Sequence, residues 1–289
     1  MTDVAERIAQ AFVAACRDEL QALKPGNVHV FADGHGMTAN DFVRSAAVAA
    51  GPLTQPGAKV GARILGAVEA TRAAVATNTN LGIILLCAPL AAAAEHQPSD
   101  RRPSALRATV AGVLEALDVE DAALAFRAIT LASPGGLGTA ARHDVRAPPT
   151  VSLRTAMAEA AERDRIARQY VSDFEDVFVT GADALAGARR RGPARAAMEV
   201  FLAFLAAFPD SHIVRKHGAV KAEEVRHLAQ NLCAWLLAAP PAQLMDRLLD
   251  WDRQLKRNNI NPGTSADLTV ATLFAAYLQD GLPSRRNSD

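Results

Sequence analysis

The sequence predicts an all-α fold: a single compact domain of about ten or more helices over residues 1–289, with polar loops between them. Three observations predict this fold. Apolar residues recur every three or four positions along nearly the whole chain, which is the spacing of one helix face. Alanine, the strongest helix former, supplies 62 of the 289 residues. Runs that alternate apolar and polar residues, as half-buried strands do, are short, and the best are 27–31 and 176–180.

The predicted helices follow one another, with breaks where glycine, proline and polar residues cluster. The first apolar stripe is made of Val4, Ile8, Phe12, Cys16 and Leu20. Further stripes of the same spacing lie, in chain order, within residues 60–68, 110–117, 198–208, 228–236, 244–255 and 268–278. The breaks contain no flexible linker and the chain no repeat of fixed period, so a single domain is expected.

The charge balance excludes several classes of protein. Lys and Arg number 31, Asp and Glu also 31, so the formal net charge is zero. This balance provides no basic field for nucleic acid and no polybasic segment for a membrane surface. The hydrophobic fraction of 50% excludes a disordered chain.

Cysteine use and hydropathy predict a cytoplasmic protein. The three cysteines, Cys16, Cys87 and Cys233, lie in apolar runs without metal-ligand spacing, so buried free thiols are expected. Charged residues interrupt the first turns, which argues against a secretory signal. The most apolar stretch, 81–94, is shorter than the roughly 20 residues that a membrane-spanning helix needs.

Polar residues in two early loops exceed what helix ends require. In residues 24–29 (Lys-Pro-Gly-Asn-Val-His), the proline and glycine are helix stop signals, but Lys24, Asn27 and His29 need another reason. In residues 77–82 (Thr-Asn-Thr-Asn-Leu-Gly), one side chain suffices to cap the next helix. The surplus among Asn78, Thr79 and Asn80 indicates an anion site at that helix N-terminus.

A glycine-rich loop occupies residues 133–138 (Ser-Pro-Gly-Gly-Leu-Gly) and continues to His143 and Asp144. Gly135 and Gly136 would let backbone N–H groups approach a phosphate. The loop is neither a Walker A motif, since no Gly-Lys-Ser/Thr follows, nor a dinucleotide fingerprint, since no strand precedes it. An irregular loop without a ligand is the alternative.

Two later loops complete the set. Residues 210–218 hold His212, Arg215, Lys216 and His217, a cationic cluster that suits a triphosphate better than a metal. Residues 258–267 (Asn-Asn-Ile-Asn-Pro-Gly-Thr-Ser-Ala-Asp) precede the last helix. Capping of that helix explains its threonine and aspartate, but not three asparagines and a serine.

Carboxylates outside these loops are fewer. Glu69 lies on a helix before the loop 77–82 and is predicted to point inward. The segment 162–173 alternates charges at helical spacing, which is typical of an exposed, salt-bridged helix. The sequence has no His-x-x-x-His pair, so a metal hydrolase is not supported.

Together these loops resemble the family of triphosphoribosyl-dephospho-CoA synthases, which serve citrate lyase and malonate decarboxylase. The resemblance covers about residues 19–278. Its most specific part is 259–268, similar to the family's Asn-Ile-Ser-Pro-Gly-Gly-Ser-Ala-Asp-Leu. Residues 24–26 match a Lys-Pro-Gly element, 78–82 resemble Asn-Thr-His-Lys-Gly, and 210–218 resemble Asp-Thr-Asn-Ile-x-x-Arg-Gly-Gly.

The resemblance implies an ATP-dependent triphosphoribosyltransferase. The triphosphoribosyl group of ATP would pass through C1′ to a hydroxyl of 3′-dephospho-CoA, giving an α-ribosyl link and free adenine. Lys24, Arg215 and Lys216 would bind the triphosphate, with Mg²⁺ on Glu69, Asp173 or Asp267. The remaining nucleotide-binding residues would be Asn27, Asn78, Thr79, Asn80, Gly135, Gly136, His212, His217, Asn261, Gly263, Thr264 and Ser265.

The catalytic roles have several candidates. Asp267 or Asp144 would stabilise an oxocarbenium-like centre, as in glycoside cleavage. His29, His143 or an aspartate would take the acceptor's proton. Asparagines such as Asn261 would hydrogen-bond the departing adenine.

Departures from the family pattern leave the acceptor open. This chain has His29 where the family has Asp, Leu81 where it has Lys, and residues 135–138 in place of Gly-Ala-Arg-Gly-Glu. A second acceptor is therefore the ribityl hydroxyl of a tetrahydromethanopterin precursor, which carries the same kind of α-ribosyl link. The alternative of another class is a non-catalytic helical nucleotide-binding protein, in which the loops would be dispersed. The alanine-rich stripes can pack within one subunit or across a homodimer.

Overall fold

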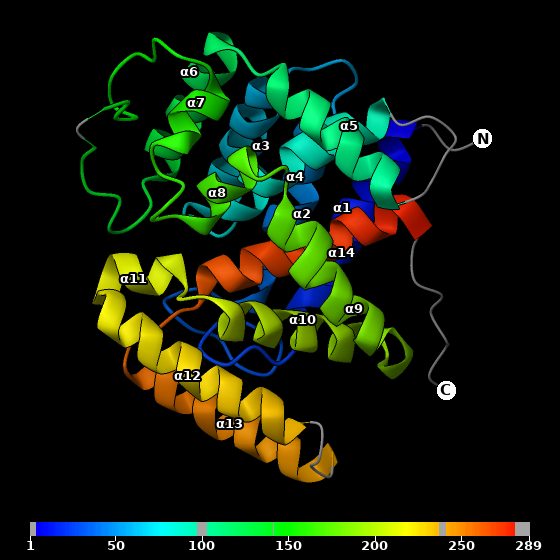
Figure 1. Cartoon of the computed structure of the whole chain (residues 1–289), viewed down its shortest axis with the longest axis vertical. Helices are drawn as coiled ribbons and strands as arrows, with labels where there is room; N and C mark the ends of the chain where they lie inside the picture. Colours follow the sequence, from blue (N-terminus) through cyan, green and yellow to red (C-terminus); the bar gives the residue numbers. More distant parts are fainter. Residues whose placement is uncertain (1–3, 97–102, 141, 237–240, 281–289) are drawn as a thin grey trace.

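The computed structural model describes residues 4–96, 103–140, 142–236 and 241–280. It confirms the all-α prediction (Figure 1). The helices, in chain order, are α1 (Val4–Leu20), α2 (Ala39–Leu53), α3 (Val60–Val75), α4 (Leu81–Glu95), α5 (Pro103–Glu115), α6 (Val119–Ala132), α7 (Leu153–Ala158), α8 (Arg165–Val171), η1 (Asp176–Gly181), α9 (Ala182–Ala188), η2 (Arg189–Arg191), α10 (Pro193–Ala207), α11 (Ser211–His217), α12 (Ala219–Leu236), α13 (Pro241–Arg257) and α14 (Gly263–Asp280).

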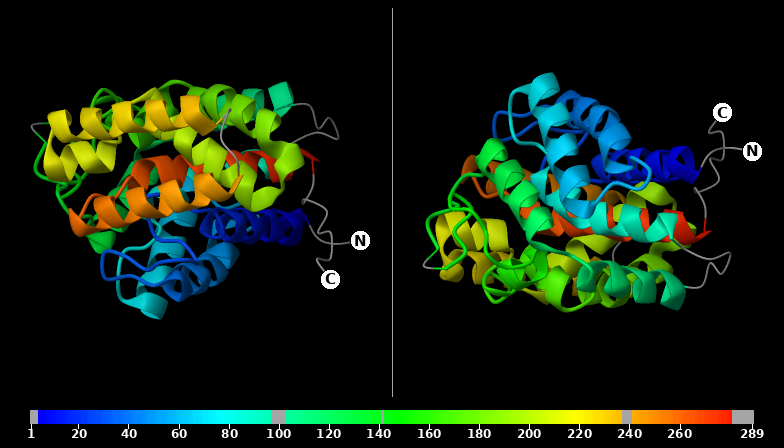
Figure 2. Two further views of the ribbon diagram at one scale, coloured as in Figure 1. Left: turned by 90° about the horizontal axis from the view of Figure 1, so that it is seen from below. Right: turned by 90° about the horizontal axis from the view of Figure 1, so that it is seen from above.

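Two helices, α4 and α14, form the centre of the fold. Thirteen of the eighteen residues of α14 are buried, and it contacts α1, α4, α10 and α11 among others. Helix α4 is apolar on every face and almost wholly buried, so it is a core helix. Small alanine side chains on these helices allow close approach of their neighbours. Figure 2 shows α14 running through the body with the other helices around it.

The two strand-like runs do not form strands. Residues 176–180 belong to η1, a π-helix, and at its end Gly181 packs so closely that a Cβ there would lie 2.2 Å from Oγ1 of Thr272 on α14. A wider helical turn at this position is consistent with such a close contact. In 27–31 the extended pairing is one isolated bridge between His29 and Ala32. Apolar alternation at these positions therefore reflected local packing instead of a sheet.

No single helix of the described ranges is long and apolar enough to cross a membrane. Among the described residues, the pair of α10 and α11 together has the length and apolar composition of a membrane span, but the two helices are bent by 55° at the break between them. The cysteines are free thiols. Cys87 is buried as predicted, whereas Cys16 and Cys233 are only half-buried.

Chain topology brings the loops toward the start of α14. The N-terminal loop between α1 and α2 packs on the end of α13, and the connection from α13 leads directly into α14. Helices α12 and α13 lie side by side in a hairpin that extends from the body (Figures 1 and 2). The long connection from α6 to α7 lies on the same side of the molecule as α11 (Figure 1).

Candidate active site

One cavity of about 970 Å³ gathers residues from all the polar loops singled out in the sequence. Its walls include Asn27, the segment 77–82, the segment 133–140 with 142–145, and the beginnings of α11 and α14. Segments more than 200 residues apart in the chain therefore share one site. This convergence argues against a scaffold whose loops only cap separate helices.

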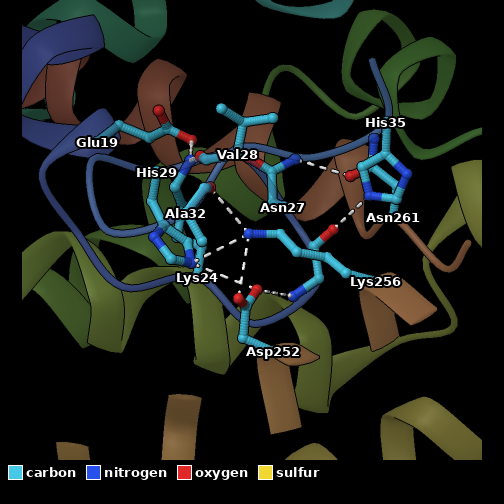
Figure 3. Close-up of polar contacts among 11 residues, drawn as sticks. Glu19, Lys24, Asn27, Val28, His29, Ala32, His35, Asp252, Lys256 and Asn261 are labelled. Carbon is cyan, nitrogen blue, oxygen red and sulfur yellow. Dashed lines mark hydrogen bonds and ion pairs between the residues drawn. The ribbon is translucent and has the colours of Figure 1, made fainter. Parts of the chain in front are cut away.

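Lys24 does not face the cavity, contrary to the prediction that it binds triphosphate. It is 1% exposed, and its ammonium donates to Glu19, to Oδ1 of Asn27 at 2.8 Å and to the carbonyl of Val28 at 2.8 Å. All three of its N–H donors are thus engaged within the protein. Lys24 instead supports two residues that do line the cavity, Glu19 and Asn27 (Figure 3).

His29 also lies outside the cavity, although the sequence predicted a catalytic role for it. Its ring is fully buried outside the cavity, and Nε2 lies 3.3 Å from the carboxylate of Asp252. Burial lowers the pKa of His29, and Lys256 adds to the effect, although Asp252 opposes it. Asp252 also accepts the N–H of Gly26 at 2.8 Å. The cluster is therefore an anchor that fixes the loop after α1 onto α13 (Figure 3).

The polar residues before α4 serve packing as well as the cavity. Oδ1 of Asn78 accepts the N–H of Leu81 at 3.2 Å and so satisfies the first free N–H of α4, whose N-cap residue, Asn80, makes no capping bond itself. The hydroxyl of Thr79 is 2.6 Å from that of Ser45 on α2, and Asn80 donates to Oγ1 of Thr71 on α3 at 3.1 Å. These contacts account for side chains that capping alone did not explain, and all three residues of 78–80 line the cavity.

The glycine loop lies directly over the cations of α11. A Cβ at Gly135 would lie 3.2 Å from Cε of Lys216, and one at Gly136, whose φ is +75°, would lie 3.0 Å from Cγ of Arg215. Nε of Arg215 donates to the carbonyl of Gly135 at 3.3 Å. The positive φ at position 136 favours glycine, and the loop backbone and these cations together form the positive part of the cavity.

His212 lies beside this positive part as a neutral imidazole. Burial, with the charges of Arg215 and Lys216, lowers its pKa to about 3. Gly263 makes room for the ring, since a Cβ there would lie 2.7 Å from Nδ1. His212 therefore enters the site as a polar, uncharged group. His217 points elsewhere, with Nε2 3.0 Å from the carbonyl of Asn259, and does not line the cavity.

Asp210 joins α11 to α14. One carboxylate oxygen accepts the N–H groups of His212 at 2.9 Å and Ile213 at 3.2 Å, while the other accepts both the N–H and the hydroxyl of Ser265 at 2.8 Å. Ser265 is accordingly buried behind the cavity and not at its surface, contrary to its predicted role as a nucleotide ligand. Thr264 lines the cavity, and its nucleotide-binding role stays a prediction.

Asp267 reaches the cavity from α14. Burial raises the pKa of its carboxyl well above the usual range, and Asp210, Glu19 and Asp164 add to the shift. This environment favours the protonated form of the carboxyl over the ionised one. Asp144, by contrast, accepts the N–H groups of Ala140 at 2.8 Å and Arg146 at 2.9 Å, which lower its pKa. Asp144 closes its own loop as a carboxylate.

Comparison with known proteins decides the family. Residues 5–286 match the family model of ATP:dephospho-CoA triphosphoribosyl transferase, CitG. The chain belongs to this transferase family. The resemblance found in the polar loops is thereby confirmed, and the family acts on ATP and dephospho-CoA.

A crystal structure of a proposed triphosphoribosyl-dephospho-CoA synthase from Archaeoglobus fulgidus shares the fold, with a TM-score of 0.63 and 23% identity. The match covers 82% of this chain and 98% of that chain. This likeness supports the helical fold of the transferase family. No curated protein matches the chain.

The metal ligands predicted for this transferase do not come together. Glu69 is exposed at the surface, 3.9 Å from Arg127, and Asp173 pairs with Arg154 at 3.0 Å. Neither lines the cavity, so of the three predicted ligands only Asp267 does. The described ranges contain no group of three or more His, Cys, Asp or Glu arranged to hold a metal. Glu69 lies on the exposed face of α3, whereas Asp173 lies half-buried in the turn after α8 with a φ of +50°, and each pairs with an arginine.

Sequence analysis missed Glu19 and Asp210. Glu19 lines the cavity, and burial raises the pKa of its carboxyl although Lys24 opposes the shift. The sequence could have indicated Glu19, because an acidic residue in the last turn of a helix is disfavoured by the helix dipole and so needs another reason. Asp210 was visible only as the first residue of a cationic loop. Its bonds to α14 are long-range contacts that sequence spacing does not encode.

Proposed function

We propose that this protein transfers the 5-triphosphoribosyl group of ATP to a hydroxyl of 3′-dephospho-CoA and releases adenine. The convergence of a cationic turn, a glycine loop and a buried carboxyl in one 970 Å³ cavity carries the proposal. Such a cavity has room for a nucleotide and for part of a second substrate. Membership of the transferase family supplies the two substrates.

The triphosphate would bind at the positive part of the cavity. Arg215 and Lys216 provide charge, and the backbone of Gly135 and Gly136 lies against their side chains. The nucleotide would enter as MgATP, with the ion carried by the triphosphate as part of the substrate. The triphosphate stays intact because the reaction occurs at C1′ of the ribose.

At C1′ the bond to adenine would break as the acceptor oxygen bonds to the same carbon. The electron pair of the broken bond leaves with adenine, so protonation of the base lowers the barrier. Asp267 suits this role because its environment keeps the carboxyl protonated. Among the predicted bases, His143 lines the cavity while His29 is buried outside it, so His143 would take the hydroxyl proton.

The ribityl hydroxyl of a tetrahydromethanopterin precursor stays as the second acceptor. The observation that favours it is Leu81, an apolar residue of the cavity wall where the family pattern has lysine. Loss of that cation would reduce attraction for the diphosphate of dephospho-CoA, and an uncharged arylamine ribitol would not need it.

The experiment offers both acceptors to the protein with MgATP and follows products by mass spectrometry. The proposal expects dephospho-CoA to gain the mass of a triphosphoribosyl group. A product only with the ribityl acceptor would replace the first acceptor by the second. ATP binding without any transferred group would leave a non-catalytic nucleotide-binding protein and overturn both.

A further inference from the structure

A buried lysine sets the hydrogen-bonding polarity of one cavity wall. The ammonium of Lys24 lies 2.8 Å from Oδ1 of Asn27 (Figure 3). An ammonium has donors and no acceptor, so it can face only the oxygen of the asparagine amide. The NH₂ group of Asn27 must therefore turn the other way, toward the cavity and toward Asn261.

Asn261 is oriented in turn by Asn27. Nδ2 of Asn27 donates to Oδ1 of Asn261 at 2.8 Å, which fixes the oxygen of Asn261 toward its partner. The NH₂ group of Asn261 has no hydrogen bond among the described residues, and Asn27 has a second N–H to offer. Both asparagines line the cavity. The pair thus presents N–H donors, and not carbonyl oxygens, to a ligand.

The backbone that carries the two amides is fixed independently. The N–H of Gly26 donates to Asp252 at 2.8 Å, and Nε2 of His35 lies 2.7 Å from the carbonyl of Gly26. Nδ1 of His35 is 3.2 Å from Oδ1 of Asn259, so one imidazole joins the two loops. A flip of the Asn27 amide would set its NH₂ group against the ammonium of Lys24. The hydrogen bonds to Lys24 and to Asn261 would both be lost.

The charges around this wall indicate which part of a nucleotide it meets. Glu19 lines the cavity here, and Asp267 is close enough to act on the charge of Lys24. The cation beside the asparagines, Lys24, is already paired with Glu19, whereas Arg215 and Lys216, which suit a triphosphate, lie at the glycine loop. The donors therefore face the nucleoside.

We infer that Lys24 is a positioning residue, which orients Asn27 and Asn261 as a donor pair for the ribose oxygens and adenine nitrogens of ATP. The inference depends on the proposed function only in taking ATP as the ligand. It gives the most specific loop of the sequence, residues 259–268, a role in recognising the nucleoside, separate from triphosphate binding.

The test measures dissociation constants for adenosine, MgATP and inorganic tripolyphosphate by calorimetry. Asn261→Ala removes two donors without adding charge, and is expected to weaken adenosine and MgATP binding about tenfold while tripolyphosphate binding stays unchanged. Asn27→Asp keeps the bond from Lys24 but forces Asn261 to donate to residue 27. The oxygen of the Asn261 amide then faces the cavity, so adenosine, a neutral ligand, should also bind about tenfold more weakly.

The role of Lys24 is tested by the double variant Glu19→Gln with Lys24→Met, which leaves no charge at either position and frees the Asn27 amide to rotate. It should weaken adenosine binding as Asn261→Ala does. Asn258→Asp is the control for Asn27→Asp, because it makes the same change from amide to carboxylate at an exposed position of the adjoining turn. It should bind adenosine as wild type does.

Unchanged adenosine affinity in Asn261→Ala and Asn27→Asp would overturn the inference, as would an equal loss of tripolyphosphate binding in Asn261→Ala. Wild-type protein that binds neither adenosine nor MgATP would overturn it too. Adenine release is measured separately. Absence of transfer with intact, variant-sensitive adenosine binding would therefore remove the proposed function and leave this inference standing.

Discussion

Gly82 lies against the carboxyl of Asp267 so closely that a Cβ at position 82 would be 2.1 Å from Oδ2. The contact joins the first turn of α4 to the first turns of α14, the two central helices. No side chain other than hydrogen fits between them. The position of the carboxyl in the cavity therefore depends on a glycine on another helix.

Gly82→Ala should displace Asp267 and reduce adenine release about 100-fold, because a misplacement of roughly 1 Å at a reacting group has that cost. The rate of adenine release with saturating substrates is the measurement. Gly112→Ala on α5 is the matched control, since no atom would lie within 4 Å of its Cβ. That control should keep full activity, and equal activity of the two variants would contradict the role of the contact.

Asp267→Asn should raise stability at neutral pH while removing activity. Burial and the neighbouring Asp210, Glu19 and Asp164 raise the folded-state pKa above the unfolded value of about 3.9. The wild-type carboxyl therefore lowers the free energy of unfolding only above about pH 4, and the loss grows as pH rises through the folded-state pKa.

Asparagine at position 267 does not titrate, so the variant does not lose stability in this way. Its melting temperature should exceed that of wild type at pH 7, and the difference should shrink toward pH 4. Thermal denaturation at the two pH values measures this. A variant less stable than wild type at pH 7 would contradict the assignment of a protonated carboxyl.

Lys24→Met should destabilise the protein by about 3–5 kcal/mol, since it leaves Glu19 buried without its charged partner. Urea denaturation measures the change in free energy of unfolding. Adding Glu19→Gln should restore most of the loss. If the double variant were no more stable than the single one, the buried ion pair would not be the cause.

Lys216→Ala should raise the KM for MgATP about tenfold with a smaller effect on kcat, because a cation against the glycine loop binds the triphosphate. The effect should diminish in high salt, where screening weakens the wild-type contact. Lys221→Ala, which removes an exposed lysine of α12, is the control. An unchanged KM for MgATP would place the triphosphate elsewhere.

Helical periodicity was sufficient to predict the fold class. Stripes such as Val4 to Leu20 coincide with one observed helix, since an amphipathic face is a local property. The π-helix at 176–181 could not be predicted from local spacing, since the contact that Gly181 makes with Thr272 joins segments about 90 residues apart.

The site was predictable by residue type more than by orientation. The loops that converge were identified from their surplus polar residues. Asp267, Asn261 and Arg215 line the cavity, and the roles predicted for them stay predictions. Lys24 and His29 stand in the same short loop but point inward, toward Glu19 and Asp252. A motif specifies which residues meet, whereas the partners that neutralise buried charge depend on the fold.

Adenine release tests the central claim most directly. Wild-type protein is incubated with MgATP and dephospho-CoA, and adenine is quantified by chromatography alongside the coenzyme product. The account predicts one adenine for each dephospho-CoA consumed, with all three phosphates of ATP retained in the product. Release of ADP or pyrophosphate in place of adenine would contradict reaction at C1′, and with it the proposed triphosphoribosyl transfer.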